Sequence, residues 1–187
     1  DMQGSRGKLA LLELKSALAY SENNLQKSIE FANEGLKMEE KSARFMLQRG
    51  LAKVALEQEE GYADLEKALS LGFDSERYLH ILLDTLIINN KTDKAIEKIT
   101  ALSEDYQKDT TIMIKLGNAY VQKKEFDKAK ELFDKILKDN EEYAPALLGN
   151  AVMMWKQNKH SDAIKWFEKA VAAREEYPEI YENIGLM

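Results

Sequence analysis

Apolar and small residues along this chain fall at helical spacing and are interrupted by short polar breaks. In the stretch LGNAYVQKKEFDKAKELF, residues 116–133, Gly117 and Tyr120 precede such a break, and Ala129 and Phe133 follow it. Spacings of three and four residues are typical of one face of an α-helix. The stretch is therefore predicted to form two helices separated by a turn.

The same pattern returns 34 residues along the chain in both directions. A forward shift places Gly117 on Ala151 and Phe133 on Phe167, and a backward shift places Phe133 on Ile99. A second column consists of small residues at the same period: Ala95, Ala129 and Ala163. A fixed period of this length is typical of a solenoid, in which each helix pair needs its neighbours to bury its apolar face.

The period divides the chain into five helix-pair units and a fragment, and one unit is a residue short. We expect a single solenoid from residue 9 to residue 187, preceded by a short flexible head. The small columns indicate positions where the two helices of a unit cross closely. The head, the units and the partial last unit are predicted at residues 1–8, 9–42, 43–75, 76–109, 110–143, 144–177 and 178–187.

Helix ends are predicted from the polar breaks. The breaks contain Asn90-Lys91, Lys124-Glu125 and Asn158-Lys159. Asparagine tolerates the left-handed conformation that ends many helices. The residues expected to cap the second helices are Asp93, Asp127 and Ser161-Asp162. Pro145 and Pro178 are predicted in the first turns of first helices, where proline removes no helical hydrogen bond.

Composition favours an all-α protein. Of the 187 residues, 44% are hydrophobic and 32% are charged, with nine glycines and two prolines. The chain is too apolar for a disordered segment and too poor in turn residues for a sandwich or barrel of many short strands. Alanine, leucine, glutamate and lysine are abundant, and these residues lose little side-chain freedom in a helix.

Charge and hydropathy argue against nucleic-acid binding and membrane insertion. The net charge is −6, and none of the units has an excess of basic residues that could follow a phosphate backbone. The longest apolar run, residues 79–88, is interrupted by polar residues and is shorter than the roughly 20 residues of a membrane span. The absence of cysteine fits a reducing compartment and favours the cytoplasm. The chain opens at Asp1 without a signal-like segment, so we expect it to be a piece of a longer protein.

Candidate catalytic chemistry is sparse, and no cofactor or metal is predicted. His80 and Asp84 are four residues apart and could form a base and its orienting group, but no nucleophile accompanies them. A groove-lining or ion-paired His80 is the preferred interpretation. His160 occupies the column of Phe126, which indicates packing between helices. The chain is therefore not expected to be an enzyme.

The 34-residue period, with LGNAY…A…F in residues 116–133 and NA…M…A…F in residues 150–167, resembles the tetratricopeptide repeat family. The resemblance extends from about Leu9 onward and departs from the family pattern at Asn150 and Ile136. It implies a right-handed α-solenoid of antiparallel helix pairs. It also implies a scaffold that binds a protein or peptide partner on its concave face.

The resemblance places certain positions of the first helices in a peptide-binding groove. The residues at these positions are Arg44, Leu47, Leu51, Val54, Arg77, His80, Asp84, Ile87, Ile88, Ile114, Asn118, Val121, Gln122, Leu148, Val152, Trp155 and Lys156. Members of the family that bind a terminal carboxylate use lysine, asparagine and arginine there. Only Asn118 fits that pattern, because Leu47, Ile114 and Leu148 replace the cations. The groove is thus predicted to be apolar and to bind an extended or helical segment, with arginine and tryptophan as candidate anchors.

Three alternatives stay open at this point. Some of these positions could pack between adjacent first helices instead of lining a groove. The chain could be a substrate-selecting or regulatory module of a larger enzyme. It could also self-associate, because Ile180, Ile184 and Leu186 leave the last unit without the polar cap that solenoid ends need.

Overall fold

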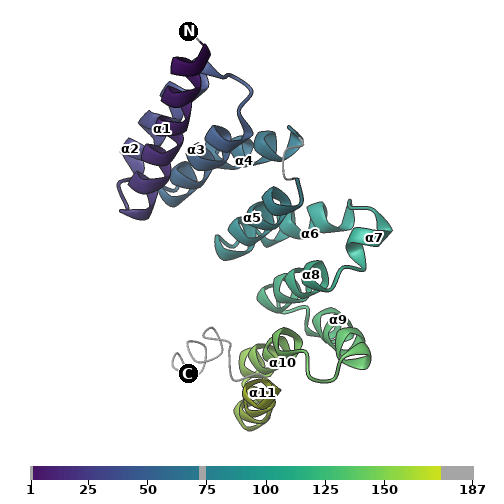
Figure 1. Ribbon diagram of the computed structural model, residues 1–187. Coiled ribbons are helices and arrows are strands. Elements are labelled where there is room, and N and C mark those ends of the chain that lie inside the picture. Colours follow the sequence, from purple (N-terminus) through teal and green to yellow (C-terminus); the bar gives the residue numbers. More distant parts are fainter. Residues whose placement is uncertain (1, 72–74, 174–187) are drawn as a thin grey trace. The chain divides into compact units, whose positions relative to one another are not determined.

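The computed structural model describes residues 2–71 and 75–173, which form α-helices and no strands (Figure 1). The chain divides into two compact units, residues 1–85 and 86–187, with the boundary inside α5. The helices are α1 (Met2–Ser21), α2 (Leu25–Met38), α3 (Ala43–Ala55), α4 (Glu60–Ser70), α5 (Ser75–Ile88), α6 (Thr92–Thr100), α7 (Glu104–Gln107), α8 (Thr110–Gln122), α9 (Phe126–Asp139), α10 (Ala144–Lys156) and α11 (His160–Ala173). The all-α prediction is therefore confirmed. Helix α1 begins at Met2, within the segment expected to be a flexible head.

Tight turns within the helix pairs repeat the same backbone conformation. A non-glycine residue with φ between 56° and 62° occurs at each of these turns: Asn23, Glu57, Asn90, Lys124 and Asn158. These five residues are separated by 34, 33, 34 and 34 positions. The sequence period, including the unit that is one residue short, is therefore present in the backbone. The predicted breaks at Asn90, Lys124 and Asn158 are confirmed as helix ends.

Lys124 is a residue type that disfavours this conformation. Its φ is 61°, and a left-handed conformation costs an L-residue other than glycine about 1–2 kcal/mol. We expect Lys124→Gly to raise the free energy of unfolding by about 0.5–1 kcal/mol, measured by urea denaturation. Lys124→Ala is the matched control, because it removes the same side chain without adding conformational freedom. An equal gain from both substitutions would contradict the prediction.

The expected N-caps of the second helices are wrong. Lys91 and Glu125 occupy the cap positions of α6 and α9 and make no side-chain cap hydrogen bond, while Asp93 and Asp127 lie in the first turns. The turns are instead closed by the backbone, for example by Glu125 N–H donating to the Tyr120 carbonyl at 2.9 Å. An Asp in the first turn still interacts favourably with the helix dipole.

The predicted N-cap of α11 is also wrong. This helix begins at His160, so Ser161-Asp162 lies inside the helix. A side-chain cap occurs where none was predicted. The Asp109 carboxylate accepts a 3.0 Å hydrogen bond from the Ile112 N–H at the start of α8. Pro145 lies in the first turn of α10, as predicted, and Pro178 lies outside the described residues.

In the first compact unit, α1 packs on α2, α2 on α3, and α3 on α4. The predicted close crossing is confirmed between α3 and α4, because a Cβ atom on Gly50 would lie 2.9 Å from the Gly61 carbonyl oxygen. Between α1 and α2, serines occupy the small columns, with Ser16 aligned to Gly50 and Ser28 aligned to Ala129. Ser16 Oγ donates to the Ser28 carbonyl at 2.9 Å, and both residues are fully buried. Small residues therefore bring paired helices together at two successive units.

In the second compact unit, α8 packs on α9, α9 on α10, and α10 on α11. Here the small residues on the first helices leave room for an aromatic ring. The ring of Phe133 fills the space above Gly117 of α8 and Gly149 of α10, so that a Cβ on either glycine would lie within 2.9 Å of the ring. Phe133 is fully buried in the core between these two first helices. Gly117 is small because of this ring rather than because the backbones touch.

Candidate functional site

In the first compact unit, the predicted groove residues lie on α3 and α5 and differ in burial. Arg44 and Arg77 are exposed, and Val54 is buried against Gly61 of α4. Val54 therefore belongs to the core and contributes no binding surface. The remaining predicted positions are half-buried: Leu47, Leu51, His80 and Asp84.

Two of these residues have defined contacts within the same unit. The Arg44 guanidinium lies 3.2 Å from the Glu13 carboxylate of α1. Leu47 borders a core cluster that includes Met46 and Tyr78. Tyr78 comes from α5, so α3 and α5 meet at this cluster. The first-helix positions on α3 and α5 thus lie around a shared core.

In the second compact unit, the predicted positions lie at the end of α5 and on α8 and α10. Val121 is buried in the core and therefore does not contribute to the candidate surface. The exposed residues are Ile88, Asn118, Gln122 and Lys156, and the half-buried residues are Ile87, Ile114, Leu148, Val152 and Trp155.

Helices α8 and α10 are adjacent first helices and contact each other. Their equivalent positions form two rows of side chains. Ile114 and Val152 both border the core around Phe133. We call Ile114, Asn118, Gln122, Val152 and Lys156 the α8–α10 face. Along it, half-buried aliphatic side chains alternate with exposed amides, and Lys156 supplies its only charge among these five residues.

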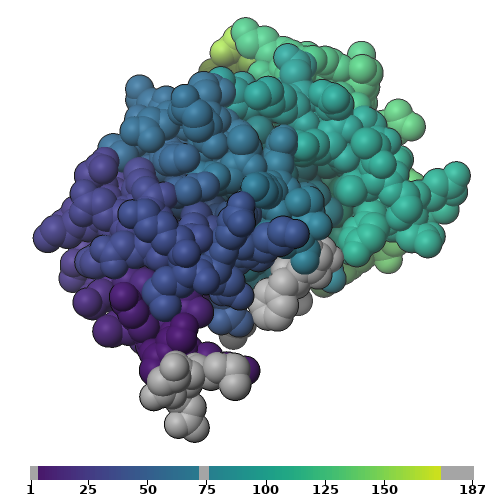
Figure 2. All heavy atoms as spheres, turned by 90° about the horizontal axis from the view of Figure 1, so that it is seen from above, coloured from purple at the N-terminus to yellow at the C-terminus, as the bar shows by residue number. Residues whose placement is uncertain are grey.

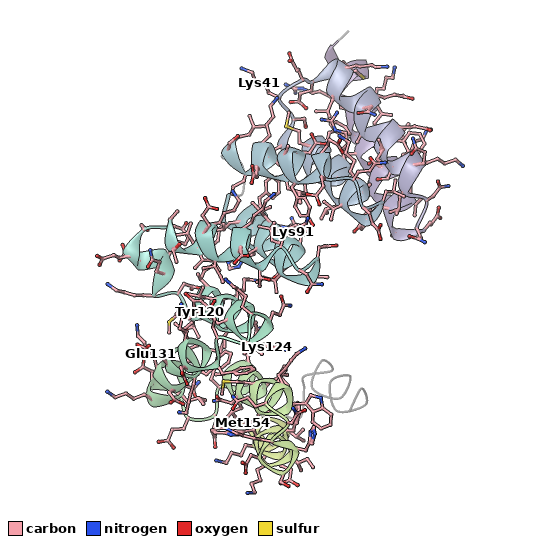
Figure 3. The ribbon with its side chains drawn as sticks, turned by 180° about the vertical axis from the view of Figure 1, so that it is seen from behind. Lys41, Lys91, Tyr120, Lys124, Glu131 and Met154 are labelled. Carbon is pink, nitrogen blue, oxygen red and sulfur yellow. The ribbon has the colours of Figure 1, made fainter. Side chains whose placement is uncertain are left out.

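Figure 3 labels two further side chains of these helices, Tyr120 on α8 and Met154 on α10. Both pack on the same core from its edge. The Lys128 ammonium lies 5.2 Å from the centre of the Tyr120 ring, within cation–π range. Tyr120 thereby links α8 to the start of α9.

Trp155 makes contacts that favour a packing role. Its ring meets the His160 ring edge-on with centroids 4.2 Å apart. It also packs against a cluster formed by Ala151, Ala163 and Phe167, which joins α10 to α11. The interpretation of His160 as a packing residue is thus supported, although its side chain is exposed. Trp155 therefore packs between α10 and its own second helix α11, not between adjacent first helices.

A charged network in the first compact unit was missed by sequence reasoning. Arg49 of α3 donates to both carboxylate oxygens of Asp64 on α4, at 2.7 and 2.6 Å. Lys53 donates to the same carboxylate at 2.9 Å, and Arg49 also donates to Asn33 of α2 at 2.9 Å. The sequence feature that could have indicated this network is Arg49, a charged residue at the repeat position where later units have Leu82 and Leu116.

Burial raises the pKa of Asp64, but the hydrogen bonds and positive charges of Arg49 and Lys53 outweigh it and hold the pKa below its ordinary value of 3.8. A carboxylate held by two cations at this depth stays ionised and cannot act as a general acid near neutral pH. The network is therefore a structural connection between α2, α3 and α4.

The remaining candidate chemistry is limited to His80, whose Nδ1 is buried without a hydrogen-bond partner in the described part of the chain.

Residues 2–71 and 75–173 contain no group of three side chains that could hold a metal ion. Among the described helices, none combines the length and apolar character needed to cross a bilayer.

Comparison with known proteins gives the family context. Residues 114–178 match the tetratricopeptide repeat family. No curated protein matches the chain.

Three solved structures illustrate the shared fold. A tetratricopeptide repeat protein from Parabacteroides merdae is 19% identical, with 94% of this chain and 70% of that chain covered and a TM-score of 0.68. MamA from Desulfovibrio magneticus is 17% identical, with 91% and 97% covered and a TM-score of 0.66. YrrB, described as a TPR protein with an unusual peptide-binding site, is 19% identical, with 91% and 88% covered and a TM-score of 0.57.

These identities establish likeness of fold and nothing about partners. The fold agrees with the family match, because a structure described as a tetratricopeptide repeat protein has the same fold. Residues 114–178 thus match the tetratricopeptide repeat family, and the chain as a whole shares the fold of the three solved structures.

Proposed function

We propose that the chain is a non-enzymatic scaffold that binds a segment of another protein along its first helices. The observation that carries this proposal is the α8–α10 face, where equivalent positions of two repeats are available at the surface. Asn118 and Val152 occupy one repeat position, and Gln122 and Lys156 occupy another. Two neighbouring repeats thus present a surface that one extended segment can follow.

The chemistry of this face fits a peptide backbone flanked by apolar side chains. The amides of Asn118 and Gln122 can each donate and accept hydrogen bonds, as a peptide backbone requires. Ile114 and Val152 offer aliphatic surface next to them. Each apolar side chain that covers this surface contributes about 25 cal/mol per Å² removed from water. The proposed partner is therefore an extended or helical segment with apolar side chains.

The proposal excludes recognition through a terminal carboxylate. By the family resemblance, Leu47, Ile114 and Leu148 replace the cations of the members that bind a terminal carboxylate. All three are half-buried and aliphatic. In the first compact unit, Leu51, His80 and Asp84 occupy first-helix positions of the same kind, together with exposed Arg44 and Arg77.

A displayed library of random dodecapeptides tests the proposal with the full chain as bait. We expect selected peptides to be apolar and to bind the chain at least about tenfold more weakly after Asn118→Arg, measured by fluorescence anisotropy. Glu131→Arg is the matched control, because Glu131 is exposed on the second helix α9. Circular dichroism confirms that both variants are folded. Equal binding by the two variants, or enrichment only of peptides that depend on a free carboxylate, would overturn the proposal.

A further inference from the structure

A pocket of the first compact unit lies between the first half of α1 and the start of α3. Its volume is about 510 Å³. Apolar lining comes from Leu9 and Ala10 of α1 and from Leu71, the residue that follows α4. The four consecutive residues 42–45, at which α3 begins, also line it. The pocket therefore combines apolar surface with the N-terminal end of a helix of 13 residues.

Ser42 brings an unused hydroxyl to this pocket. The residue is only 8% exposed, and it stands at the cap position of α3 without making a side-chain cap hydrogen bond. Among the described residues its hydroxyl has no other partner. The fully enclosed polar atoms without a partner belong instead to Gln48, His80 and Asn150, so the Ser42 oxygen is accessible from the pocket that it lines. Burying a hydroxyl without a hydrogen bond is unfavourable, and an acceptor in the pocket would satisfy it.

The backbone of α3 adds further donors at the same place. The first N–H groups of a helix have no acceptor within the helix and point out of its N-terminal end. In α3 the Met46 N–H donates to the Ser42 carbonyl at 3.1 Å and closes the first turn. The earlier N–H groups receive no acceptor from the Ser42 side chain. Together with the helix dipole, they favour a negative charge in the pocket.

The charged side chains of the pocket favour the same sign of ligand. Its lining includes the cations Arg6, Lys41 and Arg44 and the carboxylates Glu13 and Glu39, an excess of one positive charge. Glu13 lies 3.2 Å from the Arg44 guanidinium, which compensates its charge. Lys41 is exposed in the loop between α2 and α3 (Figure 3). The beginning of α1, darkest purple in Figure 2, lies at the surface of the molecule, so Arg6 is accessible to a ligand.

We propose that this pocket binds a phosphate monoester carried on an apolar group. A phosphate has three terminal oxygens that are strong acceptors. They can accept together from the Ser42 hydroxyl, from the first N–H groups of α3 and from the Lys41 ammonium. The apolar group of the ester then lies against Leu9 and Leu71. This site uses none of the residues of the α8–α10 face and does not depend on the function proposed for that face.

NMR titration of the full ¹⁵N-labelled chain tests the site with phenyl phosphate and inorganic phosphate as probes. We expect the largest amide shifts at residues 42–45, and binding of phenyl phosphate at least about tenfold tighter than that of inorganic phosphate. The phenyl ring covers apolar surface that a free ion leaves in water. Equal affinity for the two probes would overturn the assignment of an organic ester. Unchanged shifts at residues 42–45 would overturn the site altogether.

A short neutral peptide that carries phosphotyrosine distinguishes the two sources of this chemistry. Tighter binding of the peptide than of phenyl phosphate would assign the ligand to a phosphorylated partner protein. Binding no tighter than that of phenyl phosphate would assign it to a small phosphate ester. The corresponding peptide with unmodified tyrosine is the control. If it binds as well as the phosphorylated peptide, the pocket does not recognise phosphate.

Substitutions locate the donors. Ser42→Ala is expected to weaken phenyl phosphate binding about tenfold without lowering the urea midpoint of unfolding, because the hydroxyl makes no cap hydrogen bond. Lys41→Gln is expected to weaken binding and its dependence on salt. Lys27→Gln is the matched control, because it removes the same charge from the exposed first turn of α2. Unchanged binding by Ser42→Ala, or equal losses from the two lysine substitutions, would contradict the proposal.

Discussion

Replacing Phe133 by alanine is expected to lower the free energy of unfolding by about 3–5 kcal/mol. The ring is fully buried and lies between Gly117 of α8 and Gly149 of α10. Glycines have no side chains that could move into the vacated space, so most of the cavity would remain. Glu131→Ala on the exposed side of α9 is the control and should change the free energy of unfolding by less than about 0.5 kcal/mol. Urea denaturation measures both.

A double-mutant cycle separates loss of packing from damage to α9 itself. In the wild type, Gly149→Ala introduces a Cβ that would lie 2.5 Å from the Phe133 ring, so it is expected to be destabilising. In the Phe133→Ala background the same methyl group enters the cavity and adds helix propensity, so it is expected to be stabilising. The sign change measures direct coupling between the two positions. Additive effects, or a loss below about 1 kcal/mol for Phe133→Ala, would contradict the structural interpretation.

Much of the fold could be predicted because its period depends on local chemistry. The columns of Gly117, Ala129 and Phe133 and the polar breaks mark both helices and turns within one unit. What could not be predicted was the partner of each small residue. A Cβ on Gly50 would meet the Leu65 side chain and the Gly61 carbonyl oxygen, whereas a Cβ on Gly117 would meet an aromatic ring. Spacing alone does not distinguish these two reasons for a missing side chain.

The candidate site was less predictable, because register gives the side of a helix but not the depth of a side chain. Val54 and Val121 share one repeat position with Trp155, yet both valines are buried and Trp155 is half-buried against α11. A short aliphatic residue at that position fits under its own second helix. Asn150 shows the converse case, with a polar side chain in the core whose Nδ2 has no hydrogen-bond partner among the described residues.

The network around Asp64 provides the second large effect. Asp64→Asn removes the charge that two cations share, while Arg49 and Lys53 remain with side chains only 23% and 21% exposed. Leaving a partly buried charge without its counter-ion is costly, so we expect a loss of about 3 kcal/mol in the free energy of unfolding near neutral pH. Asp134→Asn is the matched control, because the Lys130–Asp134 pair is about half exposed. Such surface pairs contribute at most about 1 kcal/mol.

The pH dependence of this loss identifies its cause. The pKa of Asp64 in the folded protein lies below 3.8. At low pH the unfolded chain therefore binds a proton at Asp64 more readily than the folded chain does, and this favours unfolding. The stabilisation is therefore complete above the ordinary pKa and disappears as the pH falls through the lowered value. The difference in stability between wild type and Asp64→Asn should shrink steadily as the pH falls below about 5, as followed by urea denaturation at each pH. A difference that stays constant down to the lowest pH would show that Asp64 acts through its shape rather than its charge.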